Sequence, residues 1–202
     1  MLTANQKTLY AYESESQAYI RKTPDHVTGS AKEWIDEALS GLHETAHIFE
    51  IGSGNGRDAD YIESLGFDIE CSDAAQSFVS TLLAKGFNAR IHNAILDPII
   101  GSYDFIFANA VLPHFTHEEA TLVTSKVLIA LKPRGRFAFS LMKGEGERWC
   151  SQEMGAPVCY YYWTRQQVEA LLRTTGFRKW SITEDTTDFL EENVWLRVIA
   201  YK

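Results

Sequence analysis

The feature that most constrains this chain is a glycine-rich turn between an apolar strand and a helix. Residues 47–56 read His-Ile-Phe-Glu-Ile-Gly-Ser-Gly-Asn-Gly, and residues 57–65 follow with helical periodicity. Glycines allow positive φ angles and a close approach of the backbone to a ligand. The helix N-terminus that follows offers free N–H groups to an anion. This arrangement predicts a ligand-binding strand–turn–helix unit, with a tight turn that binds nothing as the alternative.

Strand and helix patterns alternate after this point, which is typical of a parallel α/β sheet. The last two expected strands follow each other directly, so we expect them to form an antiparallel hairpin at the sheet edge. The sequence therefore predicts a doubly wound, Rossmann-like, mostly parallel seven-stranded sheet with a C-terminal antiparallel hairpin. The strands are expected at residues 47–51, 67–72, 88–92, 103–108, 136–141, 177–183 and 193–201.

Two segments lie outside this alternation. Residues 1–45 are expected to form an N-terminal helical cap, with a capping box at residues 30–33, on a domain that spans residues 46–202. Residues 143–163 have no clear periodicity but contain several aromatic side chains. A loop of this length at the ligand-binding edge of a sheet is commonly functional, so we expect an irregular lid over the binding site.

Composition narrows the classes of function. The 202-residue chain has 19 basic and 27 acidic residues, a net charge of −8, and three cysteines without a CxxC pair. The acidic balance disfavours nucleic acid as a partner. The N-terminus has no apolar core of the signal-peptide kind, and no apolar stretch approaches the length of a membrane span. We therefore expect a cytoplasmic protein without a membrane partner.

Acidic residues at the ends of the first two strands point to a nucleoside cofactor. Asp73 closes the second expected strand, beside the glycine turn, where a carboxylate can accept hydrogen bonds from both ribose hydroxyls. Capping of the helix that begins at Ala74 is a compatible alternative. Glu50 ends a buried strand, which is costly unless donors or a cation meet it.

The glycines at 52, 54 and 56 differ from the Gly-x-Gly-x-x-Gly pattern of dinucleotide-binding proteins. Together with Asp73, the strand Tyr-Asp-Phe-Ile-Phe at 103–107 and Leu-Lys-Pro-Arg-Gly at 131–135, they make the chain resemble the class I S-adenosylmethionine-dependent methyltransferases of the small-molecule type. The likeness extends from about residue 46 to the C-terminus. It implies S-adenosylmethionine as cofactor and S-adenosylhomocysteine as product.

The resemblance also implies which residues bind the cofactor. The glycine turn would hold the methionine part, the acid after the second strand the ribose, and the residues after the second and third strands the adenine. Asn93 stands where the family commonly has Asp, and its carbonyl oxygen is expected to accept from the adenine amino group. The cofactor-binding residues expected on this basis are Glu50, Gly52, Ser53, Gly54, Arg57, Asp73, Ala74, Asn93, Ala94, Asn109 and Tyr19.

His114, after the fourth strand, is the best candidate for a general base, because its ordinary pKa suits proton transfer near neutral pH. Packing in a loop is the alternative role. The His114-x-x-His117 spacing lacks a converging carboxylate, so no metal site is expected. Within the lid, Trp149, Tyr161 and Arg148 are expected to contact the acceptor, and aromatic walls suit an aromatic, apolar or cationic molecule.

These expectations converge on methyl transfer from S-adenosylmethionine to a small-molecule O, N or C nucleophile. Two alternatives stay open at this point. A protein could bind the cofactor without catalysis, since no base is certain. An NAD-linked oxidoreductase is the other, although the Arg57 spacing and the late hairpin disfavour it.

Overall fold

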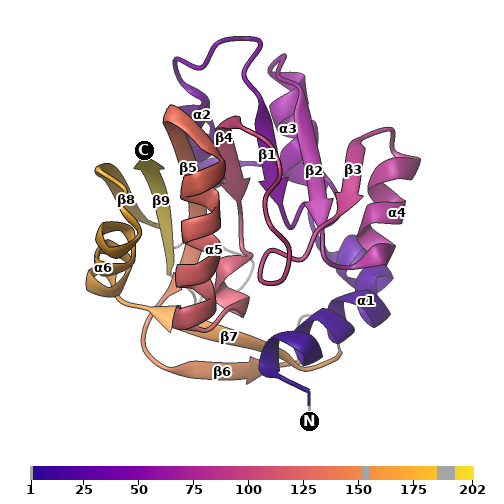
Figure 1. Cartoon of the computed structure of the whole chain (residues 1–202). Helices are drawn as coiled ribbons and strands as arrows, with labels where there is room; N and C mark the ends of the chain where they lie inside the picture. The colour runs from indigo at the N-terminus through magenta and orange to yellow at the C-terminus, as the bar shows by residue number, and fades with distance from the viewer. Residues whose placement is uncertain (1, 152–154, 186–193) are drawn as a thin grey trace.

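The computed structural model describes residues 2–151, 155–185 and 194–202, which form one nine-stranded sheet covered by helices on both faces (Figure 1). Five parallel strands run in the order β3-β2-β1-β4-β5. The antiparallel strand β9 pairs with β5, and β8 pairs with β9 at the edge. The strands are β1 Ile48–Ile51, β2 Ile69–Asp73, β3 Asn88–Ile91, β4 Tyr103–Ala108, β5 Leu131–Lys143, β6 Glu147–Cys150, β7 Val158–Trp163, β8 Lys179–Asp185 and β9 Trp195–Tyr201.

Two apolar layers pack against the sheet because successive side chains of a buried strand point to opposite faces. Ile106 of β4 belongs to the layer with α5 and α6, whereas Phe105 and Phe107 belong to the layer with α2 and α3. The doubly wound α/β fold predicted from the alternating pattern is confirmed. The helices are α1 Ala4–Lys22, α2 Gly29–Leu39, α3 Arg57–Ser64, α4 Gln76–Ala84, α5 His117–Ala130 and α6 Arg165–Thr175, with a 3-10 turn η1 at Leu112–His114.

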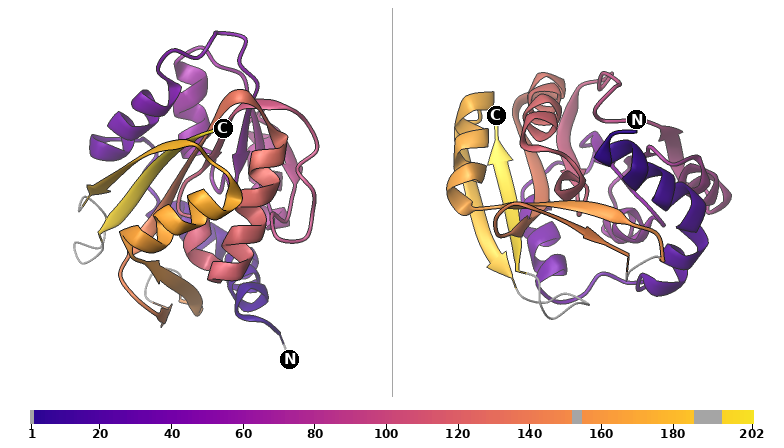
Figure 2. Two further views of the ribbon diagram at one scale, coloured as in Figure 1. Left: turned by 60° about the vertical axis from the view of Figure 1, so that its left-hand side comes forward. Right: turned by 90° about the horizontal axis from the view of Figure 1, so that it is seen from below.

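Helix α1 and the β6–β7 hairpin lie across the carboxyl ends of the parallel strands (Figures 1 and 2). The two contact each other, and the Thr8 hydroxyl of α1 accepts a hydrogen bond from the Cys159 backbone N–H of β7 at 3.0 Å. Ligands of open α/β sheets bind at the carboxyl ends of the strands. α1 and the hairpin therefore enclose the edge where a ligand is expected.

Residues 143–163 differ from the expected irregular lid. They form the strands β6 and β7, and the end of β7 pairs in parallel with β5 at Met142 and Lys143. The run Val-Cys-Tyr-Tyr-Tyr-Trp at 158–163 is rich in aromatic side chains, which favour strands, and Tyr160 and Trp163 pack on His114 and His117. The hairpin adds two strands to the predicted seven, while its connecting residues 152–154 lie outside the described residues.

The capping box expected at residues 30–33 does not form. α2 begins two residues earlier than this box predicts, at Gly29, with Thr28 at the N-cap position. The Ser30 hydroxyl instead donates a hydrogen bond to Asp185 at the end of β8. A tertiary hydrogen bond has thus replaced the local cap.

The last strand was expected to begin at Asn193, which lies outside the described residues.

None of the helices in the described part of the chain combines the length and apolar character that a bilayer-spanning segment requires. The division into a cap of residues 1–45 and a domain of residues 46–202 stays a prediction. In the structure α2 packs Trp34, Ile35, Ala38 and Leu39 into the same apolar layer as β1 and β4.

Candidate active site

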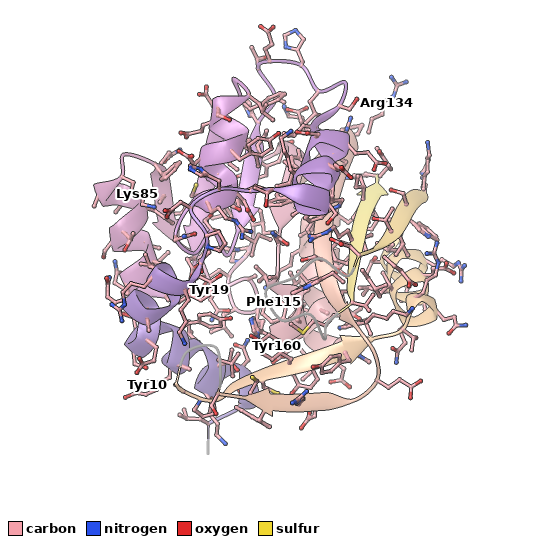
Figure 3. All side chains as sticks on the ribbon, turned by 180° about the vertical axis from the view of Figure 1, so that it is seen from behind. Tyr10, Tyr19, Lys85, Phe115, Arg134 and Tyr160 are labelled. Carbon is pink, nitrogen blue, oxygen red and sulfur yellow. The ribbon has the colours of Figure 1, made fainter. Side chains whose placement is uncertain are left out.

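A cavity of about 1030 Å³ lies at the carboxyl ends of β1, β2 and β4. α1 and the start of α2 form one wall, and β5, β7 and β9 form another. Figure 3 labels three of the lining residues, which lie near one another in that view: Tyr19 of α1, Phe115 after η1 and Tyr160 of β7. Ligand pockets are commonly about 300–1,000 Å³. The volume therefore suits a cofactor together with a small second molecule.

The glycine turn borders this cavity in a conformation that favours glycine. Gly52 and Gly54 have φ angles of +72° and +54°, in the left-handed region. A Cβ atom at Gly52 would overlap the side chain of Val111, and one at Gly54 would lie 3.6 Å from the ring of Tyr19. The turn thus holds its backbone against a β4 loop on one side and α1 on the other.

Asp73 connects the turn to the end of β2. One carboxylate oxygen accepts from the Gly54 N–H at 3.0 Å, and the other accepts from the Ala75 N–H at 2.9 Å. Burial raises the pKa of Asp73 to about 6, although these backbone hydrogen bonds oppose the rise. Asp73 and Ala74 both line the cavity, and α4 begins later than expected, at Gln76. Each oxygen keeps a lone pair for a further donor.

Glu50 and Ser53 lie beneath the turn rather than on the cavity wall. The Ser53 hydroxyl accepts from the Ser72 backbone N–H at 3.2 Å, which ties the turn to β2. Glu50 is 2% exposed, and its Oε2 atom has no hydrogen-bond partner among the described residues. Burial, with the nearby Asp58 carboxylate, raises the pKa of Glu50 to about 8. The side chains of both residues therefore support the turn.

A chain of polar groups continues from the turn into the β4–η1 loop. The Arg57 Nε lies 2.7 Å from an Asp58 carboxylate oxygen, and the other Asp58 oxygen accepts from the Asn109 amide at 2.8 Å. The Asn109 carbonyl oxygen accepts from the Ser140 hydroxyl at 2.8 Å. Ala110 follows with φ +58°, a strained angle for a residue other than glycine. Arg57, Asn109 and Ala110 all line the cavity.

The stretch after β3 lines the cavity through His92, Asn93 and Ala94. The Asn93 carbonyl oxygen already accepts the N–H groups of Ile95 and Leu96, at 3.1 and 3.2 Å. Its expected hydrogen bond from the adenine amino group stays a prediction, in which the same oxygen would accept a third donor. His92, which the sequence analysis missed, is 2% exposed, and its Nε2 atom has no partner in the described part of the chain. The sequence could have indicated His92 as a site residue, because it lies at the end of an expected strand, as Asp73 does.

His114 lies on the cavity wall with both ring nitrogens occupied. Its Nδ1 is 3.0 Å from the Cys159 carbonyl oxygen, and its Nε2 is 2.9 Å from the Tyr12 hydroxyl. A carbonyl only accepts, so a neutral ring carries its proton on Nδ1 and accepts from Tyr12 at Nε2. Burial lowers the pKa of His114 to about 4, so the ring is neutral at pH 7. Tyr12 and His114 both line the cavity, so the hydrogen-bonded pair, and not His114 alone, faces it.

The three residues expected to contact the acceptor do not line the cavity. Trp149 is 41% exposed, with the Lys7 ammonium 5.6 Å from its ring centroid, and Arg148 is also exposed. Tyr161 borders a shallow depression beside His117 instead. Tyr160 takes the expected place, because neighbouring side chains of a strand point to opposite faces. The residues that line this side and were not predicted are Met142, Tyr160, Trp195 and Arg197.

No group of three His, Cys, Asp or Glu residues within the described ranges could hold a metal ion. The buried acids near the turn are bound to backbone N–H groups, an arginine and an asparagine amide instead.

Comparison with known proteins decides the family. A family model described as a methyltransferase domain matches residues 25–182. The chain belongs to this methyltransferase family. It is an S-adenosylmethionine-dependent methyltransferase, as the resemblance in the glycine turn implied. A search of curated protein sequences gave no match.

Solved structures share the fold of this methyltransferase at low sequence identity. The magnesium protoporphyrin IX methyltransferase of Synechocystis PCC 6803 has a TM-score of 0.74 and 16% identity, covering 100% of this chain and 98% of that one. The 1,6-didemethyltoxoflavin-N1-methyltransferase of Burkholderia thailandensis has a TM-score of 0.71 and 17% identity, over 96% and 84%. A methyltransferase from Methanosarcina mazei has a TM-score of 0.68 and 18% identity, over 80% and 94%.

The cavity of this methyltransferase fits S-adenosylmethionine, its cofactor. The backbone of Gly52 and Gly54 lines the cavity without side chains, and the Asp73 carboxylate stands at the next strand end. Arg57 provides a cation and Asn109 an amide between the turn and the rest of the cavity. These groups complement a carboxylate, a ribose and a heterocyclic base, which are the polar parts of the cofactor.

Proposed function

We propose that this methyltransferase acts on a small-molecule O, N or C nucleophile. The observation that carries the proposal is the continuity of the cavity. The glycine turn and Asp73 lie on its cofactor side, and Tyr12, His114 and Tyr160 form a separate wall of the same space. α1 and the β6–β7 hairpin cross the edge of the sheet there. An enclosed space suits a small acceptor better than a polymer.

The cofactor would lie along the carboxyl ends of the central strands. Gly52, Gly54 and Arg57 would hold its methionine part, with Tyr19 covering Gly54 from α1. Asp73 would accept from the ribose hydroxyls. The adenine would lie among Ala74, Ala94, Asn93, His92 and Phe78, which line that end of the cavity.

The cofactor supplies an activated methyl group, and both electrons of the broken S–CH₃ bond stay on sulfur. The protein's main contribution is then to align the nucleophile with the methyl carbon and to exclude water, which can lower a barrier by about 7–11 kcal/mol. The aromatic and apolar side chains of Tyr160, Met142 and Trp195 would form the acceptor wall.

An acceptor that must lose a proton would use the Tyr12–His114 pair. The acceptor proton passes to the Tyr12 oxygen while Tyr12 donates its own proton to Nε2 of His114. The Cys159 carbonyl holds the ring in the tautomer that this transfer needs. Since burial keeps the pKa of His114 at about 4, the pair is a weak base and assists rather than drives the reaction.

Formation of S-adenosylhomocysteine from S-adenosylmethionine tests this proposal. The purified protein is incubated with a panel of phenols, amines and carboxylic acids, and in parallel with transfer RNA and unfolded protein. We expect turnover with members of the small-molecule panel. Methylation of the RNA or the protein, with none of the small molecules, would contradict the proposed acceptor class. A larger rise of the melting temperature with NAD than with S-adenosylhomocysteine would contradict the cofactor assignment.

A further inference from the structure

A buried arginine on β9 is not explained by cofactor binding. Arg197 is 6% exposed and lines the cavity. Its Nε bonds an Asp185 carboxylate oxygen at 2.9 Å, and its guanidinium carbon lies 5.3 Å from the ring centroid of Trp34. Neither Nη atom makes a hydrogen bond to a residue in the described ranges. Among the described residues, the four Nη N–H donors of this guanidinium therefore have no protein acceptor, and the side chain lines the cavity.

Burial of a guanidinium whose N–H donors lack acceptors costs free energy unless a ligand supplies those acceptors. A buried charged group needs both a counter-charge and hydrogen-bond partners. Asp185 supplies the counter-charge through Nε and fixes the orientation of the guanidinium. The two Nη groups form the planar fork that matches two oxygens of a carboxylate or phosphate.

The N-terminus of α2 adjoins this fork. Thr28, Gly29 and Ala31 line the same cavity, and no side chain in the described structure caps the helix at Thr28. The Ser30 hydroxyl bonds Asp185, which joins the first turn of α2 to the Arg197–Asp185 pair. A helix N-terminus presents free N–H groups and the positive end of a dipole. Both features favour an anion at the same place.

The charged side chains of the cavity wall also favour an anionic ligand. Among the described lining residues, Lys22, Arg57 and Arg197 are cations, and Asp73 is the single acid. Arg57 and Arg197 pair with Asp58 and Asp185, which do not themselves line the cavity, so cationic groups outnumber acidic ones on its wall although the chain carries a net charge of −8. Cations on the wall favour an anionic ligand.

The position of Arg197 assigns that anion to the acceptor rather than to the cofactor. Arg57 already stands beside the glycine turn, at the start of α3, which follows β1. β9 is separated from β1 by β4 and β5, three strand spacings or about 14 Å across the sheet. Arg197 is also the cross-strand partner of Ser140, which bonds Asn109. The fork therefore lies beyond the methionine end of the turn.

We propose that the methyl acceptor carries an oxyanion group, a carboxylate or a phosphate, which Arg197 and the N-terminus of α2 bind. The inference rests on the proposed function and names the class of acceptor within it. Arg197 would act as a specificity-determining residue, since binding the anion at one end of the acceptor holds its nucleophile at the other end.

The test compares matched acids and amides on the protein loaded with S-adenosylhomocysteine. Isothermal titration measures 4-hydroxybenzoate against 4-hydroxybenzamide, 4-aminobenzoate against 4-aminobenzamide, and phenyl phosphate against phenol. We expect at least one anionic probe to bind about tenfold or more tightly than its neutral partner. In Arg197→Gln that preference disappears, and in Arg197→Lys, which keeps the charge without the fork, it is reduced.

Arg136→Gln is the matched control. Arg136 also stacks on an aromatic ring, that of Tyr201, and bonds α2, but at the opposite end of that helix. It should leave the preference unchanged. If no anionic probe binds the wild-type complex more tightly than its neutral partner, the inference is wrong, whether or not Arg197→Gln folds. Loss of S-adenosylhomocysteine affinity in Arg197→Gln would assign the fork to the cofactor, and no affinity in the wild type would overturn the proposed function itself.

Discussion

Tyr12 and His114 are separated by 102 positions in the chain, yet the Tyr12 hydroxyl lies 2.9 Å from Nε2 of His114. The bond joins α1, which lies across the sheet edge, to the loop after β4. The ring centroids are 5.2 Å apart in an edge arrangement, and the Tyr160 ring lies 4.8 Å from His114 on another side. The catalytic candidate predicted from the sequence is thus a pair built from two distant segments.

Replacing Tyr12 with Phe removes the hydroxyl and keeps the ring. With an acceptor that must lose a proton, we expect kcat to fall about 10–100-fold, the lower part of the range for general-base catalysis, because His114 is a weak base. The affinity for S-adenosylhomocysteine, measured by titration calorimetry, should change little. Tyr10→Phe, on the exposed side of α1, is the control. Equal kcat values for the two variants would limit Tyr12 to packing.

The buried His114 makes stability depend on pH. Its pKa is lowered from 6.5 to about 4 by burial, so protonation favours the unfolded chain. The contribution is fully present above pH 6.5 and is lost as the pH falls toward 4, by about 3 kcal/mol in total. Asp73 acts in the opposite direction over part of this range, because its pKa is raised. The measurement is therefore the difference in urea unfolding free energy between the wild type and His114→Phe, and a difference independent of pH would contradict the assignment.

Asp73→Asn should weaken the binding of S-adenosylhomocysteine at least tenfold, since a hydrogen bond to a charged group contributes about 1.5–3 kcal/mol. In the wild type the affinity should rise between pH 5 and 7, as the Asp73 carboxyl, with a pKa of about 6, becomes ionised. The variant should not show this rise. Asp104→Asn, at the start of β4, removes a carboxylate that bonds His47 and Lys132 and should leave the affinity unchanged.

Gly52→Ala places a Cβ atom against Val111 at a residue with φ +72°. We expect a loss of about 2–4 kcal/mol in unfolding free energy, from left-handed backbone strain and overpacking together. Gly66→Ala, with positive φ but no described atom near its Cβ position, should lose only the part due to strain. Adding Val111→Ala should recover part of the loss at Gly52. Unfolding free energies of the two single variants and the double variant are measured by chemical denaturation. If the double variant recovers nothing, the contact between Cβ and Val111 does not cause the loss of stability.

Tyr160→Ala should raise KM for the acceptor, because the side chain lines the cavity, whereas Tyr161→Ala should not. The two variants remove the same side chain from neighbouring positions of one strand, so their comparison separates the cavity face from the other face. Initial rates at saturating S-adenosylmethionine provide the measurement. A larger rise of KM in Tyr161→Ala would instead support Tyr161 as the residue that contacts the acceptor, as the sequence predicts.

Much of the fold follows from local patterns in the chain. The apolar runs correspond to the strands observed, and α5 and α6 begin with capping boxes at Thr116 and Thr164 that consist of residues three positions apart. These signals act between residues that are close in sequence, and they are therefore visible without the structure. The glycine turn and Asp73 belong to the same group, because the topology of a parallel sheet brings neighbouring strand ends together.

The amino-acid sequence by itself determined the class of fold, the cofactor and the strand ends that border its site. Only the tertiary structure decided which face of β7 meets the cavity, that Tyr12 completes His114, and that Arg197 lies on the wall. The physical reason is that these relations depend on strand register and on contacts between segments more than one hundred positions apart, as for Tyr12 and His114. A shift of one residue in a strand exchanges Tyr160 for Tyr161, and a composition-based interpretation of residues 143–163 cannot distinguish them.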